Sequence, residues 1–154
     1  MAIDSAPPLP QRAELALRLY PLWVHGSHGQ DYGYLVIEVA RHDFAAACRY
    51  LRETDWLARD LVPLLLSDVP LTAADLRQLP ARVPWLAAAA DIDAQLRALR
   101  TALVLPLEQR ALVCVDFADL VAVLANGGEA RLLQAVGETA ATACEALFAH
   151  GACD

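Results

Sequence analysis

The sequence contains no lysine: its 12 basic residues are all arginine, against 19 aspartates and glutamates. The formal net charge is therefore −7, and an acidic surface repels the phosphate backbone of nucleic acids. This balance excludes a general nucleic-acid-binding function. A membrane-spanning protein is excluded too, because no uncharged stretch approaches the length of about 20 apolar residues that a transmembrane helix needs.

Cysteine is also scarce, and its arrangement carries no motif. The four cysteines, Cys48, Cys114, Cys144 and Cys153, form no Cys-x-x-Cys pair and follow no regular spacing. This pattern argues against a structural zinc site or a disulfide framework. Residues 1–10 are polar and proline-rich and lack the apolar core of a secretory signal. A reducing, cytoplasmic location is the expectation, and no cofactor is assigned.

Apolar residues make up 57% of the 154-residue chain, which is a high share for a soluble monomer of this length. The length is that of one domain, with enough chain to bury its own core. We expect part of the apolar surplus to face a protein partner, most simply a second copy in a homodimer. An abundance of alanine is the simpler explanation of the same figure.

Leucine and alanine predominate over valine and isoleucine, which indicates helices rather than strands. The predicted fold class is all-α: a single-domain helical bundle of six or seven helices over residues 11–154, after a flexible lead at residues 1–10. Its last part is a C-terminal helical hairpin, Leu107–Ala125 and Glu129–His150, with Gly127 at the turn. The remaining helices are expected at Gln11–Val24, Val36–Ala40, Phe44–Arg52, Thr54–Leu66, a short one opened by a Thr72–Asp75 capping box, and Trp85–Val104, with Arg41–Asp43 as a tight turn between two of them.

A polar, glycine-rich loop at His25–Gly33 separates two apolar stretches and is the first candidate site. His25 and His28 stand three residues apart with Asp31 and Tyr32 nearby, a combination suited to acid–base chemistry or ligand binding. His42 could join them only if the following segment folds back on the loop. The sequence offers no obvious third metal ligand, so no metal is assigned. Turn geometry alone also explains histidine, glycine and aspartate in a surface loop.

Asp116 and Asp119 interrupt a very apolar stretch and form the second candidate site, an interaction site. At a spacing of three residues, their carboxylates share one helix face and can meet Mg²⁺ or an arginine of a partner. Alternatively, Asp116 is the N-cap and Asp119 the third residue of a helix that follows an extended Ala111–Val115. In a further alternative, both mark the solvated stripe of one continuous helix.

The stretch Leu112–Leu124, with the sequence LVCVDFADLVAVL, resembles the loop and following helix of the bacterial tubulin homologue FtsZ. In that family, acidic residues of this segment complete the GTPase site of the next subunit, and Asp116 and Asp119 match that acidic pair. The departures are Cys114 in place of an asparagine, the lack of a glycine-rich phosphate loop, and a chain too short for both FtsZ subdomains. The family also has a strand and then a helix where one helix, Glu129–His150, is predicted here.

These observations favour a protein-interaction module: an adaptor, a chaperone-like protein or a regulator that self-associates through an apolar helix face. No catalytic residue is assigned, and an enzyme is the less favoured class. One alternative is a helical-bundle enzyme, or a small-ligand or metal binder, with its site at the His25–Gly33 loop. The other alternative is an FtsZ-related polymer partner that uses Asp116 and Asp119.

Overall fold

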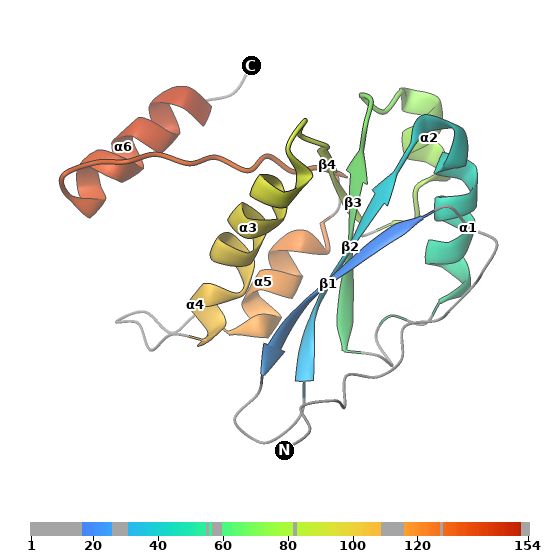
Figure 1. The fold of residues 1–154 in the computed structure, drawn as a ribbon, viewed down its shortest axis with the longest axis horizontal. Helices are drawn as coiled ribbons and strands as arrows, with labels where there is room; N and C mark the ends of the chain where they lie inside the picture. Colours follow the sequence, from blue (N-terminus) through green and yellow to red (C-terminus); the bar gives the residue numbers. More distant parts are fainter. Residues whose placement is uncertain are drawn as a thin grey trace.

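The computed structural model shows a mixed α/β fold in which helices cover both faces of one sheet (Figure 1). It describes residues 17–25, 31–54, 56, 60–81, 83–108, 116–126 and 128–151. Five strands form the sheet in the order β1-β2-β3-β4-β5. The predicted all-α bundle of six or seven helices is therefore wrong. Residues 1–10, predicted as a flexible lead, lie outside the described residues.

The first two strands form an antiparallel hairpin, β1 (Arg18–His25) and β2 (Asp31–Val39). The helix predicted to end at Val24 is wrong, because Arg18–Val24 pairs with β2, and the helix predicted from Val36 is wrong because its residues up to Val39 belong to β2. Gly33 permits the close approach of the two strands: a Cβ at this position would lie 2.2 Å from the carbonyl oxygen of Leu22.

The other strands extend the sheet in parallel, and two of them were predicted as helix. β3 (Leu61–Ser67) pairs with β2, and β4 (Pro84–Ala87) pairs with β3. Side chains on both faces of β3 are buried, since Leu64, Leu65 and Leu66 are each at most 1% exposed. A parallel strand covered on both faces is a continuous apolar run, which periodicity alone does not separate from a buried helix segment.

One face of the sheet is covered by α1 (Phe44–Glu53) and α2 (Ala73–Gln78), with the short 3₁₀ helix η1 (Arg41–Asp43) before α1. The buried residues of α1 recur at steps of three and four, so one stripe of the helix packs on the sheet. The helix predicted at Phe44–Arg52 is confirmed. The predicted capping box of α2 is confirmed as well, because Thr72 and Asp75 exchange side-chain to backbone hydrogen bonds.

The opposite face is covered by helices from the second half of the chain, which pack on Tyr34, Val36, Leu64 and Leu66. They are α3 (Ile92–Leu103), α4 (Leu105–Glu108) and α5 (Phe117–Leu124). The predicted helix Trp85–Val104 therefore divides into the strand β4 and the helix α3. In the described part of the chain, no helix is both long and apolar enough to cross a membrane.

The predicted C-terminal hairpin of two long helices is also wrong. Its first helix is replaced by α4 and α5, and its second by a short strand, an extended connection and a helix. These last elements are β5 (Gly128–Glu129) and α6 (Ala140–Gly151). Gly128 has a φ of 90°, in the left-handed region that glycine adopts without a steric penalty. Figure 1 shows α6 standing away from the helices that cover the sheet.

Candidate functional site

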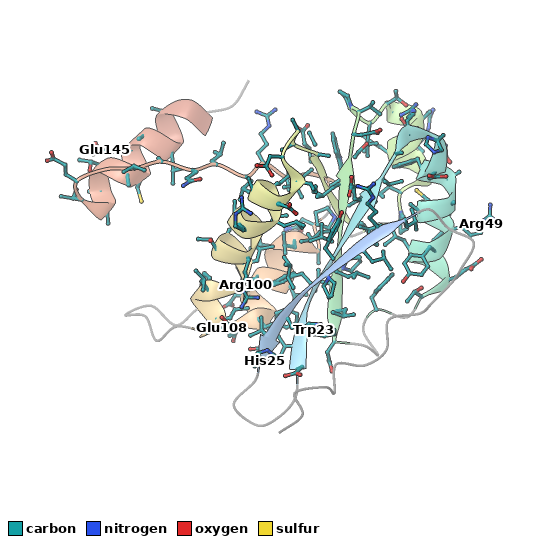
Figure 2. The ribbon with its side chains drawn as sticks, in the orientation of Figure 1. Trp23, His25, Arg49, Arg100, Glu108 and Glu145 are labelled. Atoms are coloured by element: carbon teal, nitrogen blue, oxygen red, sulfur yellow. The ribbon has the colours of Figure 1, made fainter. Side chains whose placement is uncertain are left out.

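The first predicted site lies where β1 ends and β2 begins, which we call the hairpin end of the sheet. His25 and Asp31 are register partners there, and the His25 Nδ1 atom lies 3.1 Å from the Asp31 Oδ1 atom. Figure 2 shows His25 at this end of β1, away from the helix α1 that carries Arg49. His28 lies outside the described residues.

His42, the remaining residue of the predicted loop site, lies at the other end of β2. It belongs to η1, where its Nε2 atom is 3.1 Å from the Asp43 Oδ2 atom. The nine residues of β2 separate the two histidines, a span of about 30 Å at the rise of an extended strand. The structure therefore keeps His42 apart from His25 and Asp31. Within the described ranges, no three His, Cys, Asp or Glu side chains group closely enough to hold a metal ion.

Tyr32 and Tyr34 join the hairpin end to the second predicted site through the ring of Phe117. The ring centroids of Tyr32 and Phe117 are 4.5 Å apart, and those of Tyr34 and Phe117 are 5.5 Å apart in an edge-on arrangement. Phe117 is the first residue of α5. These contacts fix the start of α5 on β2, and they bring Asp116 to the same end of the sheet as Asp31.

Asp116 and Asp119 form a reciprocal capping box at the start of α5. The Asp119 N–H donates to the Asp116 Oδ1 atom at 2.8 Å, and the Asp116 N–H donates to the Asp119 Oδ2 atom at 3.3 Å. The predicted alternative in which Asp116 is the N-cap is thus the observed one, while residues 111–115 are outside the described part. Each carboxylate uses one oxygen in these bonds, and both residues are exposed. Within the described ranges, the second oxygen of each carboxylate accepts no hydrogen bond and is available to a partner.

The charges around α5 leave this helix start acidic. Glu108, on α4 beside β1, is held by Arg100, whose Nη2 atom lies 3.4 Å from both carboxylate oxygens (Figure 2). Among the described residues, no arginine pairs in this way with Asp116 or Asp119. The arrangement can accept hydrogen bonds or meet a cationic group from another molecule.

Sequence reasoning missed the role of Phe117, because a single phenylalanine in an apolar stretch carries no positional signal. It also missed an ionic contact at the opposite end of the sheet, where the exposed Arg41 pairs with the buried Asp75. The Thr72–Asp75 spacing predicted the cap of α2, but the arginine comes from η1, far along the sequence. That contact joins η1, which follows β2, to α2, which follows β3. It lies apart from the acidic start of α5.

Comparison of the chain with models of known protein families, with curated proteins and with solved structures finds no match.

Proposed function

We propose that this chain is an FtsZ-related interaction protein, which presents the carboxylates of Asp116 and Asp119 to the nucleotide site of a neighbouring FtsZ-type subunit. The observation that carries the proposal is the start of α5. Two exposed carboxylates stand side by side there, each with one oxygen fixed by the capping box, on a helix anchored by Phe117.

The order of elements around this site supports the proposal. A strand, β5, and then a helix, α6, follow α5. This is the order that the resemblance to FtsZ implies, and it replaces the single helix predicted at Glu129–His150. The parallel strands before α3 likewise give an α/β frame in place of a bundle. The two residues of β5 stand where the family has its strand.

The lack of a phosphate-binding loop, another departure from the FtsZ pattern, determines which role we propose for this chain. The sequence has no glycine-rich phosphate loop, so the proposal places the nucleotide on the partner and only the carboxylates on this chain. In phosphoryl transfer to water, a polar side chain near the terminal phosphate orients the attacking water while a metal ion offsets the phosphate charge. Asp116 and Asp119 are proposed to orient that water with their unbonded oxygens.

The test is GTP hydrolysis by purified bacterial FtsZ with and without the wild-type chain, measured as released phosphate together with co-sedimentation of the two proteins. We expect the wild-type chain to bind and to accelerate hydrolysis. The variant carrying both Asp116→Asn and Asp119→Asn keeps the helix cap, because asparagine caps as well as aspartate. We expect this variant to keep at most about one-tenth of the acceleration, since a positioned acid or base contributes at least about tenfold.

The matched control is the double variant Asp91→Asn and Asp93→Asn. Asp91 is the N-cap of α3 and Asp93 lies in the same first turn, so this variant removes the same charge from an equivalent position. It should behave as the wild-type chain. Equal activity of the Asp116 and Asp119 variant, or an equal loss in the control, would contradict the proposed role.

A further inference from the structure

The stretch after β5 is an extended segment without a strand partner among the described residues. β5 pairs with β4 at only two positions, and the Ala130 N–H adds one bond to the Trp85 carbonyl at 2.7 Å. The chain then continues through Leu133, 47% exposed, and Val136, 89% exposed. We call residues 130–151, this stretch together with α6, the C-terminal arm. Two large exposed apolar side chains lie three residues apart on this stretch, and neighbouring exposed apolar groups are what a protein partner covers.

The connection that leads into β5 has an unfavourable handedness. The β2–β3 and β3–β4 connections run through α1 and α2 on one face, whereas the β4–β5 connection runs through α3, α4 and α5 on the other. The strand order nevertheless continues in one direction. The last connection therefore has the opposite hand to the first two, although parallel crossovers are nearly always of one hand. Only the two residues of β5 pair with β4 in this unusual arrangement, so the extended stretch that follows β5 can pair with another partner.

The arm has a defined shape and stands off the body of the protein. Thr139 and Thr142 cap α6 by exchanging hydrogen bonds of 3.1 and 3.2 Å, each from a backbone N–H to the hydroxyl of the other residue. Gly137 packs so closely on this turn that a Cβ would lie 2.5 Å from the Ala143 nitrogen. A groove of about 480 Å³ separates the arm from α3, with Ala98 on one side and Leu147 on the other. The extended stretch is thus held open to solvent.

We propose that residues 131–138 pair antiparallel with the same residues of a second copy of this chain, about a two-fold axis between Gln134 and Ala135. In that register Arg131 of one copy stands opposite Glu138 of the other, and Leu133 stands opposite Val136. Each pair occurs twice because the interface is isologous. The register joins opposite charges and covers the two exposed apolar side chains at once.

The second copy is the favoured occupant because the stretch is complementary to itself in both charge and hydrophobicity. Among the described residues, Arg131 makes an exposed contact with its neighbour in the same chain, its Nε atom lying 3.3 Å from the Glu129 Oε1 atom. An exposed ion pair of this kind contributes little to stability, so Arg131 can exchange it for Glu138 of the second copy at small cost. This interface does not depend on the proposed function of Asp116 and Asp119.

The test measures self-association of the full chain by sedimentation velocity over a range of concentrations. We expect a dimer for the wild-type chain. Arg131→Glu alone and Glu138→Arg alone each place two like-charged pairs at the interface, and we expect the dissociation constant to rise about tenfold or more. An equimolar mixture of these two single variants restores both attractive pairs and should form a heterodimer, which a fluorescent label on one variant detects.

The control is Glu129→Gln, which removes only the contact within the chain and should leave the dimer unchanged. Recovery in the mixture also shows that both single variants are folded. A wild-type chain that stays monomeric at its highest soluble concentration overturns the proposal. So does a single variant that dimerises as tightly as the wild-type chain, or a mixture that fails to recover.

Discussion

Asp75 is buried although it is charged, and its partners explain how the fold tolerates it. Its carboxylate accepts hydrogen bonds from the Thr72 hydroxyl at 2.6 Å and the Thr72 N–H at 2.8 Å, and it pairs with Arg41. These hydrogen bonds from Thr72, with the charge of Arg41 in support, hold the pKa of Asp75 below its ordinary value. The charged form is therefore part of the folded state.

The first prediction concerns the loss of that charge in Asp75→Asn. A lowered pKa contributes stability that is complete above the ordinary aspartate value of about 3.9 and is lost as the pH falls through the lower folded-state value. We expect the variant to unfold at a lower urea concentration than wild type at neutral pH, with the difference shrinking in acid. Circular dichroism at both pH values measures this. Asp68→Asn, a change at an exposed position, is the control, and a difference that stays constant into acid would contradict the prediction.

At the scale of elements, the start of α5 depends on one side chain. Phe117 is half-buried against Tyr32 and Tyr34, whereas Val123 of the same helix is 69% exposed. We expect Phe117→Ala to lower the free energy of unfolding by about 2–3 kcal/mol, somewhat less than for a fully buried phenylalanine. Val123→Ala should change it by about 0.5 kcal/mol or less. Urea unfolding measures both, and equal effects of the two changes would show that the ring does not anchor the helix.

The elements that sequence reasoning predicted correctly are those with local signals. The apolar stripe of α1 and the Thr72–Asp75 capping box are set by residues within one or two helical turns. The strands β3 and β4 lack such a signal, because their apolar residues are buried on both faces. Proline is disfavoured in a central strand, yet β3 contains Pro63: β4 pairs with β3 only from Leu65, so one side of Pro63 has no neighbouring strand in the described sheet.

The candidate site shows the same division between local and distant information. The capping role of Asp116 and Asp119 follows from their spacing and was among the alternatives drawn from the sequence. Their position at the hairpin end depends on the contact of Phe117 with Tyr32, two residues far apart in the chain. Without the sheet register, the sequence could not show that Asp31 and Asp116 reach the same end while His42 lies at the other.

At the scale of the whole molecule, the structure divides into a sheet packed on both faces and a C-terminal arm outside it. The two apolar clusters contain residues from the sheet and from the helices α1, α3 and α5, whereas no α6 residue whose side chain the structure describes belongs to either cluster. Backbone amides in well-packed elements exchange with solvent only on larger unfolding events, and those of exposed elements exchange on local opening. The molecule should therefore show two classes of hydrogen exchange.

The last prediction uses that division to examine the arm in the unmodified protein. In hydrogen exchange followed by mass spectrometry, we expect β2 and β3 to be strongly protected at every protein concentration, because their central residues are buried on both faces. Residues 130–139 should exchange rapidly in dilute solution and slowly in concentrated solution, since pairing with a second copy protects their amides by mass action. The Arg131→Glu variant should lose this concentration dependence while keeping the protection of β2. Strong protection of residues 130–139 in dilute solution would show that the arm packs on its own chain, and it would contradict the pairing with a second copy.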